Sequence, residues 1–223
     1  MKTNQELQKD VLEELKWEPS LAEVISNIGV AVDDGVVTLT GRVHSYNQKI
    51  SAEQAAQRVA GVKVVAEDIE VVIPGKSEKS DTDIAIAVKD ALKWHSAVNE
   101  DLIEIKIENG WVYLDGTAEW DYQKKAAENA VKDIVGVVRV VNRISLKPSV
   151  NASDVKSKIM AAFHRSATID AGNISIEAAG TKVILRGMVR SWIEKKEAEN
   201  AAWSAPGVTE VENLISIDTE ILV

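Results

Sequence analysis

The stretch VYLDGTAEWDYQKKAAENAVKDIVG, residues 112–136, sets the organisation of the whole chain. An alternating apolar segment ends at Gly116, an alanine-rich segment with helical spacing follows, and a second glycine closes it at Gly136. The same pattern occurs at residues 37–61, VTLTGRVHSYNQKISAEQAAQRVAG, and at residues 183–207, VILRGMVRSWIEKKEAENAAWSAPG. Such self-similarity indicates one structural unit of about seventy residues that is used three times.

Two glycines mark every copy, and they are always twenty residues apart: Gly41 and Gly61, Gly116 and Gly136, Gly187 and Gly207. The first of each pair ends a strand pattern, where glycine permits a kink or a close approach of backbone. A phosphate-binding role for it is the weaker alternative, because no second glycine follows it. The second of each pair ends the alanine-rich helix as a C′ residue.

Each copy opens with an amphipathic helix, since apolar residues recur at helical spacing over residues 7–15, 84–92 and 155–163. We expect Asp81 or Thr82 to cap the second of these helices and Ser153 to cap the third. Two alternating segments then follow, joined by Asp-Gly or Asn-Gly, which are strong hairpin signals. The third copy lacks this dipeptide, and its hairpin is expected to contain one extra residue.

A last alternating segment closes each unit at residues 65–71, 140–146 and 211–217. The element order is therefore helix, strand, strand, helix, strand. This order predicts an α+β fold: three tandem αββαβ two-layer sandwiches, each with a three-stranded mixed sheet and two helices on one face. The expected domains are residues 1–74, 81–148 and 151–223, separated by short polar linkers.

Composition narrows the class of protein. The net charge of −9 is a poor match to nucleic acid, so no nucleic-acid partner is expected, and it disfavours simple electrostatic attraction to anionic lipid. The chain has no cysteine, which excludes disulfides and thiolate metal sites. The N-terminal residues lack the apolar region of a signal peptide, and no apolar run is long enough to span a membrane. These features predict a soluble cytoplasmic protein, or a periplasmic one if a signal has been removed.

The sequence shows no pattern of catalytic or metal-binding residues. The three histidines, His44, His95 and His164, are far apart, and none of them has a second histidine at helical spacing. No serine lies in a nucleophile elbow, and the acidic pairs lie at expected turns or strand edges. We therefore expect no catalytic residues, no metal, no cofactor and no enzymatic activity.

The aromatic residues are the one anomaly, because six of them are tryptophan. Four aromatics fall between the first glycine and the second helix of their copies, and Trp111 lies beside Tyr113 on the hairpin face expected to point away from the helices. Trp17 and Trp94 end the first helix of their copies. The candidate contact surface consists of Tyr46, Trp111, Trp120, Tyr122 and Trp192. Three alternatives remain open for it: packing between units, an external surface for lipid or protein, and a small-ligand pocket.

These motifs together resemble the BON domain. The residues that carry the resemblance are the strand ending VxLxG, the helix KKxAExAAxxxxGV and the sequel VxNxI at residues 140–144 and 211–215, where the first copy has Glu67 instead of asparagine. The resemblance covers nearly the whole chain and implies a non-enzymatic bacterial domain associated with osmotic and envelope stress. It also implies binding of phospholipid or a membrane surface, here through the aromatic residues. A cytoplasmic protein–protein interaction scaffold in the stress response is the alternative, and the oligomeric state is left open.

Overall fold

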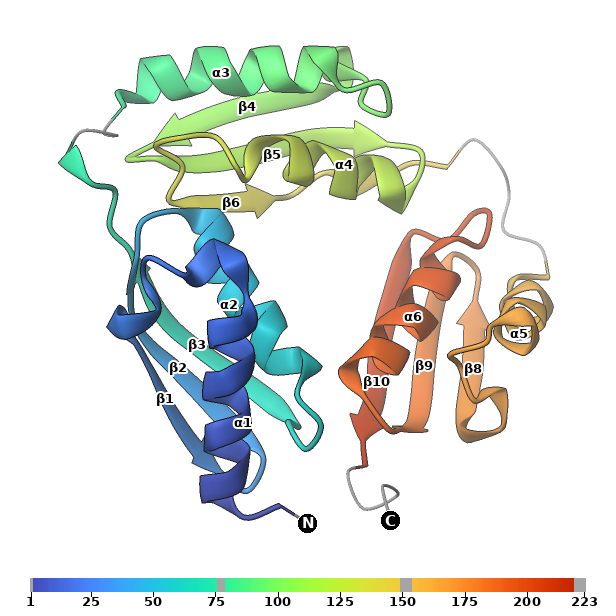
Figure 1. The fold of residues 1–223 in the computed structure, drawn as a ribbon. Helices are drawn as coiled ribbons and strands as arrows, with labels where there is room; N and C mark the ends of the chain where they lie inside the picture. The colour runs from blue at the N-terminus through green and yellow to red at the C-terminus, as the bar shows by residue number, and fades with distance from the viewer. Residues whose placement is uncertain (1, 76–78, 149–153, 219–223) are drawn as a thin grey trace. The chain divides into compact units, whose positions relative to one another are not determined.

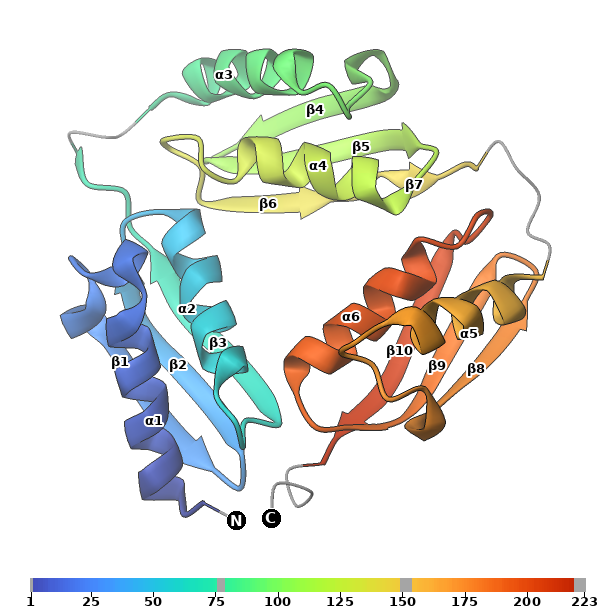
Figure 2. The same ribbon diagram turned by 45° about the vertical axis from the view of Figure 1, so that its right-hand side comes forward.

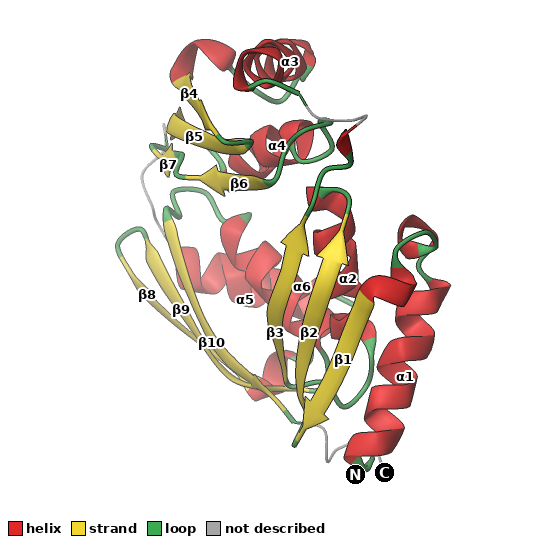
Figure 3. Cartoon of the chain, turned by 90° about the vertical axis from the view of Figure 1, so that its left-hand side faces the viewer, coloured by secondary structure: helices red, strands yellow, loops and turns green. Residues whose placement is uncertain are grey.

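The computed structural model describes residues 2–75, 79–148 and 154–218 (Figure 1). Three α+β domains follow one another along the chain, each with its own sheet and its own pair of long helices. In each of them the strands form one layer and the helices form the other, as Figure 3 shows by colour. The predicted fold class is confirmed.

The first domain shows the arrangement of all three. Its elements are α1 (Asn4–Trp17), β1 (Ile28–Asp33), β2 (Val36–Val43), α2 (Tyr46–Arg58) and β3 (Val64–Val71). The central strand β2 pairs antiparallel with β1 and parallel with β3, because the hairpin connects the first pair and a helix connects the second.

The other two domains repeat this order. The middle domain contains α3 (Asp81–Trp94), β4 (Ile103–Glu108), β5 (Trp111–Ala118), α4 (Asp121–Val131), β6 (Arg139–Asn142) and β7 (Ser145–Leu146). The third contains α5 (Val155–Arg165), β8 (Ile174–Ala179), β9 (Lys182–Val189), α6 (Trp192–Trp203) and β10 (Glu210–Ile217). The last strand of the middle domain is divided, since β6 and β7 pair in turn with β5. Helices α3 and α4 cover the same face of their sheet (Figure 2).

The cores follow the apolar patterns of the sequence. In the first domain the buried stripe Leu7, Val11 and Leu15 of α1 belongs to one cluster with Val37 and Leu39 of β2. The second helix contributes only alanines to this cluster, Ala52, Ala55 and Ala56. Side chains this small let a helix lie close to the sheet, and the third domain repeats the device with Ala198 and Ala202.

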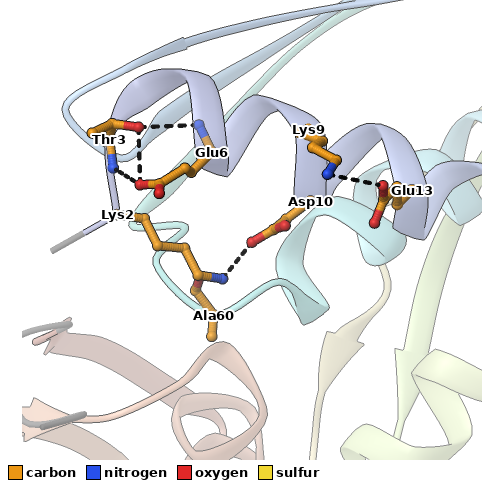
Figure 4. Close-up of polar contacts among 7 residues, drawn as sticks. All are labelled: Lys2, Thr3, Glu6, Lys9, Asp10, Glu13 and Ala60. Atoms are coloured by element: carbon orange, nitrogen blue, oxygen red, sulfur yellow. Dashed lines mark hydrogen bonds and ion pairs between the residues drawn. The ribbon is translucent and has the colours of Figure 1, made fainter.

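Capping residues define where the first helices begin. Thr3 and Glu6 form a capping box at α1, in which Thr3 Oγ1 accepts from the Glu6 amide at 3.2 Å and Glu6 Oε2 accepts from the Thr3 amide at 2.8 Å (Figure 4). Ser80 and Asp83 form the same box at α3, so the expected cap at Asp81 or Thr82 was wrong by one or two residues. Asp154 is the N-cap of α5, and the expected cap Ser153 lies outside the described residues.

The expected extra residue in the third hairpin was also wrong. Ala179 pairs with Lys182, which leaves a two-residue turn of the same length as in the other domains. Gly180 takes a φ of +60° at the first turn position, where the other hairpins place Asp34 and Asn109 at positive φ. Glycine at this position matches the type II′ turn, which needs no Asx-Gly dipeptide.

The first glycine of each pair lies where the second strand crosses the start of the first. Gly116 has a φ of +130° and pairs with Ile103, and a Cβ added there would overlap the carbonyl oxygen of Leu102. Gly41 and Gly187 are in the same situation, against the carbonyl oxygens of Asn27 and Asn173. Both the positive φ and the close backbone approach require a residue without a side chain. The glycines that follow the second helices, Gly61, Gly136 and Gly207, also have positive φ.

Candidate functional site

The asparagine of the VxNxI motif anchors the last strand to the second helix. Asn142 Nδ2 donates to the carbonyl oxygen of Lys124 at 2.8 Å, and its Oδ1 accepts from the amide of Ile144 at 3.2 Å. Asn213 repeats both contacts in the third domain. These bonds hold the fold together, so the motif is structural and indicates no ligand.

In the first domain different residues attach the last strand to the second helix. Glu67 Oε1 accepts from the amide of Ile69 at 2.9 Å, as the asparagine oxygen does elsewhere. A carboxylate cannot donate to the helix, and Glu67 instead pairs with the Lys49 ammonium at 3.1 Å. Lys49 Nζ in turn donates to the carbonyl oxygen of Ile69 at 2.7 Å. The departure of the first copy from the motif is therefore compensated within that domain.

A polar side chain in the first turn of each second helix was missed by sequence reasoning. The side-chain oxygen of this residue accepts a hydrogen bond from a backbone amide in the segment that precedes the helix. The residues are Gln48, Gln123 and Glu194. Glu194 is buried and also accepts from the amide of Asp170 at 2.9 Å, which ties the helix to the loop after α5. The signal that could have found them is a Gln or Glu seven residues after the first fixed glycine in all three copies.

Metal-ligand chemistry has no basis in the part of the chain that the structure describes. Across residues 2–75, 79–148 and 154–218, no three His, Asp or Glu side chains are placed to hold a metal ion. A shallow groove of about 530 Å³ lies beside Gly41 and is lined by Asn27, Arg42, His44, Val72 and Pro74. None of the predicted aromatic residues lines this groove.

Four of the predicted aromatics lie at the N-terminal ends of the second helices. Tyr46 begins α2, Trp192 begins α6, Trp120 immediately precedes α4, and Tyr122 is in the first turn of α4. Only Tyr122 is exposed, at 58%, and the other three are half-buried. The indole Nε1 of Trp192 is buried and has no hydrogen-bond partner among the described residues. Two of these four aromatic residues, Trp120 and Tyr122, belong to the middle domain, whereas the first and third domains have one each.

Three of the exposed aromatic and apolar side chains of the middle domain lie at one end of it, while the exposed Ile86 and Val135 lie elsewhere. Trp94, the last residue of α3, is 84% exposed, and Leu102, just before β4, is 47% exposed. Because β5 returns antiparallel to β4, with Gly116 opposite Ile103, α4 also begins at this end (Figure 2). Tyr122 is in the first turn of α4. We call Trp94, Leu102 and Tyr122 the apolar tip. Trp94 was noticed in the sequence but not included in the candidate surface, and Leu102 gave no signal.

The other domains do not repeat the apolar tip. The first domain has Trp17, which is 82% exposed at the end of α1, but Asn27 and Asn47 replace the leucine and the tyrosine. The third has Arg165, Asn173 and the 55% exposed Ile193 at these places. On α3 an exposed Ile86 lies on the same helix face as Trp94, two turns away, where α1 has Lys9 and α5 has Ser157.

Trp111 lies in the sheet layer of the middle domain, on the face of the sheet that points away from the helices. Its ring stacks on Tyr113, with centroids 6.4 Å apart and an interplanar angle of 27°. The guanidinium of Arg139 lies 5.0 Å from the Trp111 centroid, and Arg143 and Lys106 lie 5.1 and 5.5 Å from the Tyr113 centroid. We call this the aromatic face. Its rings are half-buried under their cations, in contrast to the exposed rings of the apolar tip.

Two of the three cations of the aromatic face, Lys106 and Arg143, are held by ion pairs. Arg143 binds Asp115 in a bidentate manner at 2.9 and 2.7 Å, and Lys106 binds Glu108 at 2.9 Å. Each hydrogen bond to a carboxylate raises the pKa of its cation above the ordinary value, so both remain charged. The first and third sheets have Val36 and Thr38, or Lys182 and Ile184, in place of Trp111 and Tyr113. The fold itself therefore does not require these aromatics.

None of the helices in the described ranges combines the length and the apolar character needed to cross a bilayer.

Comparison with known proteins identifies a protein family and two similar proteins. The family model of the BON domain matches residues 3–73, 80–148 and 151–219. A protein of Anaplasma centrale, described as an uncharacterized protein in the gshII 5′ region, is 30% identical over 129 residues, which are 56% of this chain and 85% of that protein. Osmotically-inducible protein Y of Escherichia coli (strain K12) is 31% identical over 126 residues, 55% of this chain and 63% of that protein.

Among solved structures, CdsD, a structural protein of the type III secretion system of Chlamydia trachomatis, aligns over 94% of this chain and 91% of its own. The sequence identity is 13% and the TM-score is 0.26, so this likeness carries no argument about the present chain.

Proposed function

The chain belongs to the BON domain family, and from this premise we propose that it is a non-enzymatic binding module that associates with a phospholipid surface through the apolar tip of its middle domain. The observation that carries the proposal is the exposure of Trp94, Leu102 and Tyr122 at one end of a single domain. Tryptophan and tyrosine are the residues enriched where protein meets lipid headgroups, because their rings are apolar and their edges are polar.

The physical basis of this association is hydrophobic. The net charge of −9 opposes attraction to anionic lipid, so insertion of side chains into the headgroup region has to supply the binding free energy. Full burial of a large apolar side chain such as Leu contributes about 1.5–3 kcal/mol. Three such side chains support reversible attachment rather than permanent anchoring.

The setting of this activity is part of the same proposal. One relative, which is 31% identical over 126 residues, is named as osmotically inducible. We therefore place the lipid-binding activity of this chain in the response to osmotic stress. The apolar tip would serve at any phospholipid surface.

Vesicle co-sedimentation tests the proposal. The parent chain should pellet with zwitterionic and with anionic vesicles, and added salt should change the bound fraction little. Trp94→Ala combined with Tyr122→Ala should abolish pelleting while the circular dichroism spectrum remains that of the parent. Trp17→Ala is the matched control, because it removes an equally exposed tryptophan at the same place in the first domain. If the parent fails to pellet with either vesicle at any salt concentration, the proposal is wrong.

A protein-interaction scaffold in the stress response is the second candidate function. The aromatic face favours it, because tryptophan, tyrosine and arginine are the residues that dominate protein interfaces. The apolar tip and the aromatic face belong to different layers of the middle domain, so lipid and protein could be bound at the same time. A reproducible protein partner isolated from osmotically stressed cells, whose binding is lost with Trp111→Ala and kept with Trp94→Ala, would support the scaffold.

A further inference from the structure

The outward side chains of the middle sheet form a regular grid. Strand register places Glu108, Trp111 and Arg139 in one row across the sheet, and Lys106, Tyr113 and Val141 in the next. Glu104 lies opposite Asp115 in a third row, which Arg143 completes through its ion pair with Asp115. The aromatic residues thus occupy the central strand β5, between two edge strands that carry charge.

The two edges of this grid have opposite sign. Strand β4 presents Glu104, Lys106 and Glu108, with a net charge of −1 from two carboxylates and one ammonium. The β6 edge presents Arg139, Val141 and Arg143, with a net charge of +2. Neither Glu104 nor Arg139 takes part in an ion pair within the described residues, so charge of each sign remains unmatched on its own edge.

From this pattern we infer that the aromatic face binds the same face of a second copy of the chain. When two such sheets stack about a twofold axis parallel to the strands, β4 of one copy lies over β6 of the other. Glu108 then meets Arg139 of the partner copy, Glu104 meets Arg143 of the partner copy, and the aromatic strands meet at the centre. Asp115 also meets Asp115 of the partner copy there, and the charge of each is offset by its own ion pair with Arg143. A twofold interface makes every contact twice, so one self-complementary face is sufficient.

The alternative twofold axis, perpendicular to the strands, would bring glutamate over glutamate and arginine over arginine. Like charges placed opposite each other disfavour an interface, so the charge pattern selects one of the two arrangements. Aligned packing at about 10 Å between sheets is the ordinary geometry of a β-sandwich. The dimer would therefore be a sandwich assembled from two chains.

The corresponding faces of the other domains lack this self-complementarity. In the third domain both edges are acidic, with Glu177 on β8 and Glu210 and Glu212 on β10. In the first domain both edges again carry an acidic residue, Asp33 on β1 and Asp68 on β3. The central strand β2 between them presents Val36 and Thr38. Self-association is accordingly confined to the middle domain. It does not use the apolar tip, so it stands independently of lipid binding.

Charge reversal on one edge at a time tests the inference with the full chain. Sedimentation velocity of the parent should show a concentration-dependent species of twice the 24.3 kDa chain mass. Arg139→Glu with Arg143→Glu makes both edges acidic, and Glu104→Arg with Glu108→Arg makes both edges basic. Each double variant alone should dimerise at least about tenfold more weakly, because both rows then pair like charges.

Mixing the two double variants is the decisive step. Each acidic edge then faces a basic edge again, so an equimolar mixture should recover a heterodimer, and recovery also shows that both variants are folded. Circular dichroism of each variant checks the fold separately. A parent that stays monomeric across the accessible concentration range overturns the inference. So does unchanged dimerisation of either variant, or a mixture that stays monomeric although both variants have parental spectra. Vesicle binding by the monomeric variants would leave the lipid proposal intact.

Discussion

Gly116→Ala should be among the most damaging single substitutions in the middle domain that alter no apolar side chain. Gly116 has a φ of +130°, and an added Cβ would overlap the backbone carbonyl of Leu102. The unfavourable backbone conformation costs about 1–3 kcal/mol. The overlap costs about another 1–3 kcal/mol, because the obstacle is backbone and cannot rotate away as a side chain would.

The summed loss of about 2–6 kcal/mol is large beside the 5–15 kcal/mol that stabilises a typical domain. A domain of about 70 residues loses roughly 4–8 °C in melting temperature for each kcal/mol, so the shift should be at least about 8 °C. Differential scanning calorimetry of the full chain would show one transition moving to lower temperature while the others stay in place.

Gly75→Ala is the control for this substitution, because nothing lies within 4 Å of a Cβ added at Gly75 and its φ is not in the left-handed region. It should leave every transition unchanged or slightly raised. If Gly116→Ala melts within 1–2 °C of the parent, roughly the effect of an ordinary surface substitution, the role assigned to the glycine is wrong.

Three further predictions concern other positions. Asn142→Ala should destabilise the middle domain by about 2 kcal/mol in urea unfolding, because the amide of Ile144 loses its acceptor and the bond from the side chain to the Lys124 carbonyl is lost; a neutral result would contradict the anchor. Burial raises the pKa of Glu18, but hydrogen bonds from Arg58 and Ser20 outweigh it and hold the pKa below the ordinary value of a glutamate. The stability that Glu18 contributes is therefore present above its unfolded pKa and lost as pH falls through the folded pKa. Arg58→Gln should make the acid unfolding of the first domain less steep, and an unchanged pH profile would refute this. Glu194→Ala should cost the third domain about 1–2 kcal/mol in the same urea experiment, because two backbone amides lose their acceptor; parental stability would show that the cap is dispensable.

The fold could be predicted from the sequence because its strongest constraints are local and repeated. Three copies of one periodic pattern gave the element order, and the alanines of α2 indicated a helix lying close to its sheet. The helix start at Ser80 was missed because adjacent Ser, Asp and Thr can all cap, and the choice depends on the reciprocal bond with Asp83. The third hairpin was misjudged because Gly-Thr makes a two-residue turn of a different type.

The candidate surfaces could be predicted only in part. Trp111 and Tyr113 alternate with buried residues, so their outward direction followed from strand periodicity. The exposure of Leu102 and the position of Arg139 over Trp111 depend on residues distant in sequence, which no local pattern reveals. Tyr46, Trp120 and Trp192 are half-buried, and their part in a contact surface stays a prediction.

The position of the last strand has a consequence for biosynthesis. In the first domain β3 is an edge strand, but it pairs along the whole length of the central strand β2, and its Ile69 belongs to the core. A nascent chain that has emerged only as far as α2 therefore carries an open strand edge beside an incomplete core. The first domain can close once Val71 has left the ribosome, while the middle domain is still being made. Domains generally fold as units during synthesis, so each of the three would have its own brief interval of exposure to aggregation, ending when its final strand has left the ribosome.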